Sequence, residues 1–268
     1  MLRSIRAISW KIHKISALKK MGVRMSLPAE LFSRKYSRKT MDLYKNKALE
    51  IANSMGCLFD ESIEGRELND AFVFRVYDET GFVPVSGDIV ADVGAHRGDN
   101  AVYWGKVCKA QVIAFEPLQD NFRVLQENLR LNQISAITYD VALGDGLEHK
   151  AAIVGNMLAD PDAYHDDYET HTVKTITLDS YDLHRLDILK IDVEGYEVKV
   201  LAGAIATIRR CRPRVIVETH SIELEKEVHE LLTQEGYELV RNDKSWIIPD
   251  SRFNRTRNMF FVPRGKVR

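Results

Sequence analysis

Apolar residues follow two different periods in the part of the chain after residue 87. Short continuous apolar runs predict strands that are buried on both faces, at residues 88–93, 111–115, 186–191 and 214–218. Between them, apolar residues recur every three or four positions and predict helices at residues 99–107, 118–132, 196–209 and 222–235. This alternation predicts an α/β fold with an open, mostly parallel sheet and helices on both faces.

Further strands are expected where the pattern is less regular. They lie near residues 136–142, 150–154 and 173–177. An acidic segment at 156–171 is expected to be irregular. The last two strands, near 237–241 and 258–262, have no helix between them, so we expect an antiparallel hairpin at the edge of the sheet.

The residues before this alternating region divide into two segments. We expect a basic amphipathic extension over residues 1–40, a lead-in or cap segment over 41–86, and the main domain over 87–268. In the lead-in segment, the pattern predicts a short helix over 41–56, ended by its final glycine, and a strand over 71–77.

Residues 2–20 place their large aliphatic side chains on one face of a helix. Six leucines and isoleucines recur three or four positions apart: Leu2, Ile5, Ile8, Ile12, Ile15 and Leu18. Lysines and arginines occupy the rest, so this helix could lie on an anionic membrane surface. Packing on the protein's own body or on a partner subunit is favoured, because the apolar face is narrow and only Trp10 adds an interfacial aromatic ring.

The net charge of −1 conceals an uneven distribution. Residues 1–40 hold 11 Lys/Arg and one acid, which gives +10, and the remainder holds 27 Lys/Arg and 38 Asp/Glu, which gives −11. The acidic body has the wrong sign for nucleic-acid phosphates, so no nucleic-acid partner is expected. Three widely spaced cysteines favour a reducing compartment. Without a signal-peptide core or an apolar run of ~20 residues, we expect a cytoplasmic protein, with residues 2–20 as its candidate for peripheral membrane contact.

The first strand of the main domain leads into a turn that contains glycines. Residues 87–98 read GDIVADVGAHRG, so Gly94 and Gly98 separate a buried strand from a helix that opens near Asp99. Glycine permits positive φ angles and close approach of a ligand, and a helix start offers free N–H groups to a negative group. The stretch therefore predicts a site for a nucleoside-bearing cofactor.

Two carboxylates near this turn favour one kind of cofactor. Asp92 stands where a dinucleotide-binding turn has its first glycine, and a carboxylate there would repel a pyrophosphate. It would attract the ammonium of a methionyl group, which favours S-adenosylmethionine over NAD. Glu116 ends the second strand, 24 residues after Asp92, where a carboxylate can accept both hydroxyls of a ribose. The alternative role for Glu116 is stabilisation of the following helix N-terminus.

Several motifs together resemble the FkbM family of S-adenosylmethionine-dependent methyltransferases. The resemblance rests on VADVGAHRGDN, VIAFEP, DVALGD, ITLDSYDL, LDILKIDVEGYEVKVLAGA and RPRVIVETH, which lie between about residues 88 and 220. It implies a Rossmann-like class I methyltransferase fold with a mostly parallel seven-stranded sheet. It also implies transfer of a methyl group, usually to an oxygen of a sugar or natural product.

The resemblance further implies which residues contact the cofactor. They are Asp92, Gly94, Gly98 and Glu116, with Asp140 and Ala142 near the adenine. Two positions depart from the family pattern: His96 stands where Asn is common, and Ala101 stands where Thr or Ser is common. These departures affect the contacts to the methionine carboxylate, which Asn100 could supply instead.

Methyl transfer to a hydroxyl needs an aligned acceptor and a base for its proton. Asp192 follows the strand at 186–191, at the sheet end where ligands bind, and is our first candidate for this base. Glu194 could orient the acceptor. His220 is the second candidate, because the unperturbed pKa of histidine lies near neutrality. The alternatives are a helix cap for Asp192 and a loop position for His220.

The acidic segment at 156–171 is expected where an acceptor-binding lid would be inserted. His165, Asp166, Asp167 and His171 could ligate a divalent metal. They have no fixed ligand spacing, so a solvated acidic loop is favoured and no metal site is predicted. Acidic and tyrosine side chains would also suit a polyhydroxylated sugar.

The sequence therefore predicts O-methylation of a sugar, glycan or natural-product hydroxyl with S-adenosylmethionine. Two other classes remain open. An NAD(P)-dependent oxidoreductase would share the sheet and Glu116, and a non-catalytic nucleoside-binding module would tolerate loss of Asp192.

The membrane alternative for residues 2–20 predicts weak binding to anionic vesicles. The full-length protein should then partition more strongly than a protein that starts at residue 41, because anionic headgroups attract the basic face while the apolar face is buried. Sedimentation with phosphatidylserine-containing vesicles measures the difference. Equal partitioning of the two proteins would rule this alternative out.

Overall fold

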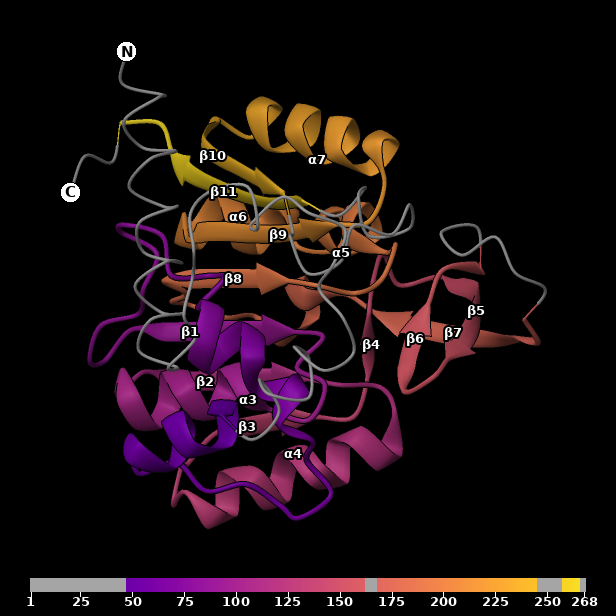
Figure 1. Ribbon diagram of the computed structural model, residues 1–268. Helices are drawn as coiled ribbons and strands as arrows, with labels where there is room; N and C mark the ends of the chain where they lie inside the picture. Colours follow the sequence, from indigo (N-terminus) through magenta and orange to yellow (C-terminus); the bar gives the residue numbers. More distant parts are fainter. Residues whose placement is uncertain (1–46, 162–167, 245–256, 266–268) are drawn as a thin grey trace, which may run out of the picture. The chain divides into compact units, whose positions relative to one another are not determined.

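The structure is a computed structural model that describes residues 47–161, 168–244 and 257–265 (Figure 1). These residues divide into two units. The smaller contains residues 47–56 and 61–76, and the larger contains residues 57–60 and the described residues from Tyr77 onward. The extension expected at residues 1–40 and the candidate ligands at 165–167 lie outside the described residues.

The described part of the smaller unit is helical. Residues 47–54 form a helix that ends before Gly56, which has a φ of 76°. Two short helical turns follow, η2 (Gly65–Leu68) with 3-10 geometry and η3 (Asn69–Phe74) with π geometry. The strand predicted at 71–77 is therefore wrong. A short apolar run fits a buried helical turn as well as a strand, and the sequence alone does not distinguish them.

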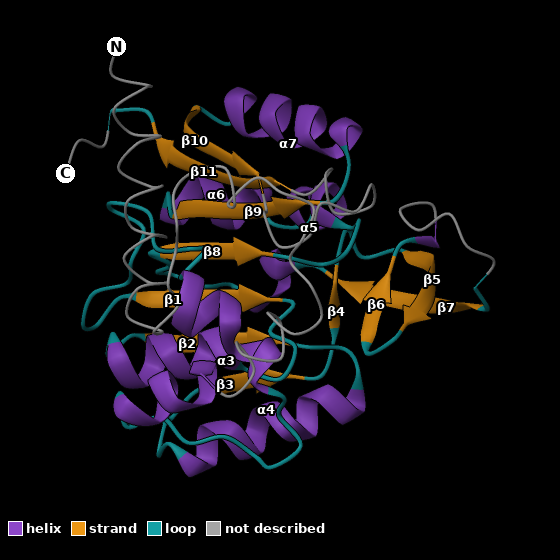
Figure 2. Cartoon of the chain, in the orientation of Figure 1, coloured by secondary structure: helices purple, strands orange, loops and turns teal. Residues whose placement is uncertain are grey.

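The larger unit is built on a seven-stranded sheet with the order β10-β11-β9-β8-β1-β2-β3 (Figure 2). Its strands are β1 (Ile89–Val93), β2 (Gln111–Phe115), β3 (Ile137–Tyr139), β8 (Ile188–Ile191), β9 (Arg214–Thr219), β10 (Tyr237–Lys244) and β11 (Arg257–Pro263). The pairs from β3 to β9 are parallel, whereas β11 is antiparallel to both β9 and β10. The predicted mostly parallel sheet with a C-terminal hairpin is confirmed, and β10 forms its edge.

Helices connect these strands. They are α3 (Asp99–Val102), α4 (Gln119–Leu131), α5 (Glu197–Ala202), α6 (Ile205–Cys211) and α7 (Ile222–Gln234), with helical turns η4 (Tyr103–Val107) and η6 (Leu178–Tyr181). Two predicted helices are thus wrong in detail, because residues 99–107 change to π geometry at Tyr103 and residues 196–209 are interrupted at Gly203. No helix in the described ranges is both long and apolar enough to cross a membrane.

The interruption at Gly203 has a steric cause. A Cβ atom on Gly203 would lie 1.9 Å from the carbonyl oxygen of Gly144, a distance that real atoms do not adopt. The backbone between α5 and α6 therefore touches the backbone that follows β4 (Ala142–Leu143). Only glycine permits this approach, and glycine also favours a break in a helix.

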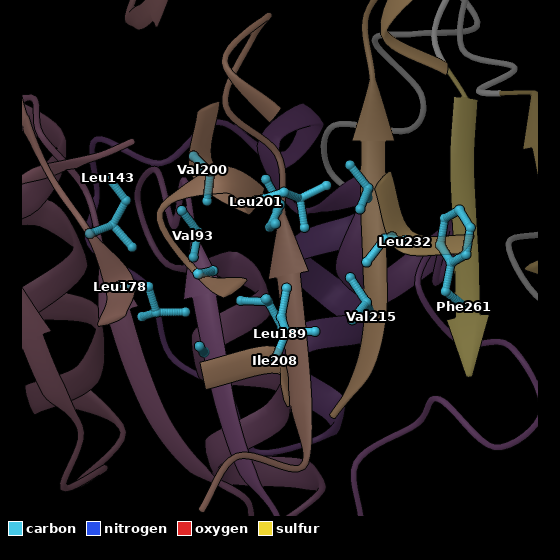
Figure 3. Packing of buried hydrophobic residues seen from close by; sticks show 14 of the residues in the cluster. Val93, Leu143, Leu178, Leu189, Val200, Leu201, Ile208, Val215, Leu232 and Phe261 are labelled. Atoms are coloured by element: carbon cyan, nitrogen blue, oxygen red, sulfur yellow. The ribbon is translucent and has the colours of Figure 1, made fainter. Parts of the chain in front are cut away.

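The main hydrophobic core lies between one face of the sheet and helices α5, α6 and α7 (Figure 3). Val93, Leu189, Val215 and Phe261 of four strands are buried in it. The helices contribute a second layer of fully buried side chains: Val200, Leu201, Ile208, Val228 and Leu232. Burial of such side chains stabilises each by about 1.5–3 kcal/mol relative to an exposed position. This packing fixes the positions of the strand ends that carry the polar residues.

A second, four-stranded sheet interrupts the alternation of strands and helices. It has the order β4-β7-β5-β6, with β5 (Glu148–Val154), β6 (Met157–Ala159) and β7 (Thr170–Ile176). The expectation of an irregular segment at 156–171 is wrong for the residues in β6 and at the start of β7. Figure 1 shows this small sheet beyond the arrowheads of β1 and β8, at the end of the main sheet where ligands bind in such folds.

The order of the main sheet reverses between β1 and β8. From β1 the chain adds β2 and β3 on one side, and it later adds β8 and β9 on the other. In this register Val93 is paired with Ile191, so the residues that follow them, Gly94 and Asp192, are also neighbours. A Cβ on Gly94 would lie 1.8 Å from the carbonyl oxygen of Asp192, which explains the glycine there.

Gly203→Ala should destabilise the protein by about 2–3 kcal/mol, because the added methyl group forces the two backbones apart. Chemical denaturation measures the change in the free energy of unfolding. The exposed change Ala206→Ser on α6 is the matched control and should stay within about 0.5 kcal/mol of the parent. Equal stability of the two variants would contradict the close approach.

Candidate active site

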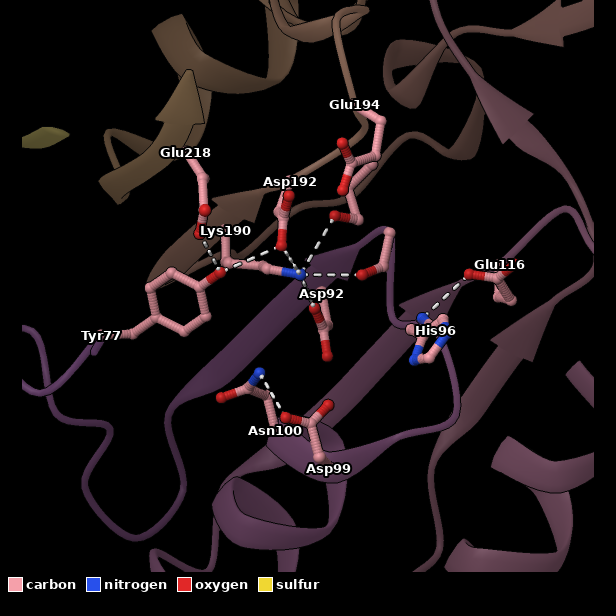
Figure 4. A network of polar contacts seen from close by, with 12 residues as sticks. Tyr77, Asp92, His96, Asp99, Asn100, Glu116, Lys190, Asp192, Glu194 and Glu218 are labelled. Carbon is pink, nitrogen blue, oxygen red and sulfur yellow. Dashed lines mark hydrogen bonds and ion pairs between the residues drawn. The ribbon is translucent and has the colours of Figure 1, made fainter. Parts of the chain in front are cut away.

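A buried ion pair lies where the sheet order reverses. Asp92 of β1 and Lys190 of β8 are partners in the parallel register, and their side chains are 0% and 2% exposed. The Lys190 ammonium lies 3.0 Å from Asp92 Oδ1 and donates to the carbonyl oxygen of Gly94 at 2.8 Å (Figure 4). It also lies 3.8 Å from Asp192 Oδ2. One cation therefore contacts the carboxylates that follow or end two adjacent strands.

The charge of Lys190 depends on these carboxylates. Burial alone would lower the pKa of Lys190, but Asp92 and Asp192 raise it above its ordinary value, so the side chain remains an ammonium. Neither oxygen of Asp92 accepts a hydrogen bond from the described residues. Removing one member of a buried ion pair typically costs about 3–5 kcal/mol, so Lys190 and Asp92 depend on each other.

Asp192 also meets residues from two other parts of the chain. The Tyr77 hydroxyl lies 3.0 Å from Asp192 Oδ2 and 2.9 Å from Glu218 Oε2. Nε2 of His220 lies 3.7 Å from Asp192 Oδ1 and 3.2 Å from Glu194 Oε2. Asp192, Glu194 and His220, which the sequence proposed for acceptor chemistry, therefore lie in one cluster.

His220 is held from behind by a buried carboxylate. Its Nδ1 lies 2.8 Å from Oε1 of Glu197, which is 0% exposed and begins α5. Burial would lower the pKa of His220, but Glu194, Glu197 and Asp192 together raise it well above the ordinary value. At neutral pH the ring is thus an imidazolium, with Nδ1–H directed at Glu197 and Nε2–H at the other carboxylates.

The turn after β1 combines two glycines with a strained histidine. Gly94, His96 and Gly98 have φ angles of 75°, 50° and 87°. The backbone N–H of His96 donates to Glu116 Oε2 at 2.9 Å, and its Nε2 lies 2.8 Å from the amide of Asn156. Burial and the Arg97 guanidinium lower the pKa of His96 to about 4, so this ring is neutral at pH 7.

Glu116 joins this turn to the start of α4. Its other oxygen, Oε1, accepts the Leu118 N–H at 3.0 Å and the Asn121 amide at 3.3 Å. Burial raises the pKa of Glu116, and the hydrogen bonds from Leu118, Asn121 and His96 counteract it. The contact with Leu118 is the helix-terminal contact weighed as an alternative from the sequence. A carboxylate has about four acceptor positions, so capacity for further donors remains.

The other sequence candidates lie around the same strand ends. Asn100 is buried in α3 and its amide donates to Asp99 at 3.3 Å. Asp140 follows β3, is exposed, and accepts from the Gln119 amide at 3.0 Å. Ala142 begins β4 of the small sheet. These residues approach the turn from β3 and α3, and they do not join the cluster around Asp192.

Comparison with known proteins identifies the family. The Methyltransferase FkbM domain matches residues 92–239, more than half of the 268 residues. The chain belongs to the FkbM methyltransferase family. The match begins at Asp92 and includes Lys190, Asp192 and His220, so it spans the residues that the sheet brings together.

Relatives and a solved structure agree with this family. The chain is 30% identical over 168 residues to the hexuronic acid methyltransferase AglP of Haloferax volcanii, covering 55% of this chain and 62% of AglP. It is 26% identical over 203 residues to the methyltransferase sdnD of Sordaria araneosa, covering 60% and 78%. A methyltransferase from Pyrococcus furiosus matches with a TM-score of 0.50 and 13% identity, over 84% of this chain and 96% of that chain. This likeness shows the shared fold and confirms the predicted class I methyltransferase fold.

The sequence did not point to four members of the FkbM site. Lys190 left a signal, because it is the single charged residue in the buried strand ILKI. Glu218 was visible as a strand-end acid but received no role. Tyr77 lies 115 residues before Asp192 in the chain, and Glu197 resembles an ordinary acid in a first helical turn, so neither could be found from spacing.

Three ligand-type groups in this FkbM methyltransferase converge within metal-binding distance. One atom each from Asp192, Glu218 and His220 lie within 4.8 Å of one another. Tyr77 contacts both carboxylates, and Glu197 accepts from the histidine. Of the candidates in the acidic segment, His171 lies in β7 (Thr170–Ile176).

The two buried histidines should titrate in opposite directions. At pH 7, His220 should be an imidazolium because carboxylates surround it, and His96 should be neutral because burial and Arg97 disfavour its charge. Ring nitrogen chemical shifts in NMR spectra measure both states. The variants His220→Asn and His96→Asn assign the signals, and a neutral His220 at pH 7 would contradict the cluster geometry.

Proposed function

We propose that the protein is an S-adenosylmethionine-dependent methyltransferase that methylates a hydroxyl of a sugar, glycan or natural product. The observation that carries this proposal is the placement of Asp92 and Asp192 at adjoining strand ends, with Lys190 between them. One carboxylate borders the glycine turn and the other borders a cluster of polar groups. Such a pair of neighbouring subsites is what transfer between a cofactor and an acceptor requires.

The residues around the turn fit S-adenosylmethionine. Asp92 is a fully buried carboxylate whose oxygens accept no hydrogen bond from the described residues, so it is suited to a positively charged methionyl group. Glu116 would bind the ribose hydroxyls. The remaining positions line the same strand ends: Gly94, His96, Gly98, Asn100, Asp140 and Ala142. When bound, this cofactor supplies an electrophilic methyl group and its own leaving group.

The protein's task is then to align the acceptor and remove its proton. Asp192 would accept the hydrogen bond of the acceptor hydroxyl and take its proton as the carbon–oxygen bond forms. His220 is already protonated at neutral pH, so it suits the stabilisation of negative charge better than the role of base. Glu194, which lies 3.2 Å from His220, would orient the acceptor.

The acceptor class is inferred from chemistry and from relatives. Carboxylates and a tyrosine hydroxyl around Asp192 can hydrogen-bond to a polyhydroxylated molecule. AglP is named a hexuronic acid methyltransferase, so at least one family member acts on a sugar acid. Extract incubated with cofactor carrying a labelled methyl group, followed by identification of the labelled product, would identify the acceptor.

Calorimetry with S-adenosylmethionine and with NADH separates the proposed function from its alternatives. We expect binding of S-adenosylmethionine and no binding of NADH. Absence of S-adenosylmethionine binding would refute the proposal. Binding without transfer to any labelled product would instead favour a non-catalytic module.

Cofactor binding and turnover should depend on different carboxylates. Glu116→Gln should weaken S-adenosylmethionine binding about 10-fold or more, because a hydrogen bond to a charged group is worth about 1.5–3 kcal/mol. Asp192→Asn should bind the cofactor within about threefold of the parent and lower kcat about 100-fold or more, the typical contribution of a positioned base. Calorimetry and initial rates measure the two effects.

Exposed residues provide matched controls. Glu127→Gln on α4 and Asp182→Asn after η6 make the same chemical changes away from the strand ends. Both controls should retain parental binding and kcat. Normal cofactor binding by Glu116→Gln would show that the ribose site is misplaced, and full turnover by Asp192→Asn would remove that residue as the base.

A further inference from the structure

We infer that Lys190 is a positioning residue that holds the proposed base, Asp192, in a fixed place relative to the cofactor carboxylate, Asp92. The inference rests on the proposed function and adds a residue to its reaction machinery. It follows from the contacts of one buried ammonium with two adjacent strand ends.

The position of the ammonium is fixed by the backbone of β1. Lys190 Nζ donates to the carbonyl oxygen of Gly94 at 2.8 Å and lies 3.5 Å from that of Val93. An ammonium has three donors, so one or two remain for the carboxylates of Asp92 and Asp192. Because these carbonyls belong to the turn after β1, movement of Lys190 would require movement of the glycine turn itself (Figure 4).

The spacing in β8 explains why one lysine can reach both carboxylates. Side chains two residues apart on a strand leave on the same face, so Lys190 and Asp192 start from the same side of β8. Asp92 is the register partner of Lys190 on β1 and also shares its face. The K-x-D spacing and the parallel register therefore place the ammonium between the proposed cofactor and acceptor subsites.

A cation so placed would favour the ionised form of Asp192. The groups that face Asp192 are the Lys190 ammonium, the Tyr77 hydroxyl and the His220 ring. Asp92 and Asp99 also act on Lys190, and Glu194 and Glu218 complete the surroundings. Removing the lysine removes one of the two cations next to Asp192, so its carboxylate should need a higher pH to ionise.

The test compares Lys190→Met, Asp192→Asn and the double variant at saturating cofactor and acceptor. Lys190→Met should lower kcat about 10- to 100-fold, leave the acceptor KM within about threefold, and move the acidic limb of the pH–rate profile upward by about one pH unit. The double variant should be no slower than Asp192→Asn, because Lys190 acts through that residue. Lys226→Met, an exposed change on α7, is the control and should match the parent.

Two further variants separate positioning from a contribution to folding. Asp92→Asn combined with Lys190→Met removes both buried charges, so thermal stability should recover while kcat stays low at saturating cofactor. Lys190→Arg keeps the charge and should return the acidic limb to the parental pH. Full recovery of kcat in the doubly neutral variant, or losses in the Asp192 double variant that multiply, would overturn the inference. A parent enzyme that transfers no methyl group would instead refute the proposed function.

Discussion

The buried ammonium of Lys190 is the contact on which the arrangement of the site depends. A lysine that is 2% exposed is tolerated only with compensating partners, and here Asp92, Asp192 and the Gly94 carbonyl provide them. These partners come from two strands that are adjacent only because the sheet order reverses between them. The fold therefore determines the charge pattern, and the charge pattern in turn limits how far the two strand ends can separate.

Close backbone contacts give the site its rigidity. The missing side chain of Gly94 lets the turn after β1 touch the carbonyl of Asp192, and Gly203 allows the same approach between the α5–α6 break and Gly144. Interiors packed at this density do not deform gradually. The cluster around Asp192 is consequently supported by contacts between main-chain segments, in addition to its own hydrogen bonds.

Two histidines in one protein illustrate how surroundings decide chemistry. His96 is near a guanidinium and largely buried, so it is neutral, whereas His220 is surrounded by carboxylates and is charged. The sequence could assign both only the ordinary histidine pKa. Within the family, this difference leaves Asp192 as the better base and gives His220 an electrostatic role in the proposed reaction.

The sequence alone determined the class of fold and the ends of most strands. Apolar runs are local signals, so β1, β2, β8 and β9 were predicted to within two residues, and the acids that follow them could be named. Only the tertiary structure decided the helical form of residues 71–74, the separate sheet of β4 to β7, and the contacts of Tyr77, Lys190 and Glu197. These features depend on residues distant in the chain, whose pairing follows from strand register and backbone packing that no local pattern encodes.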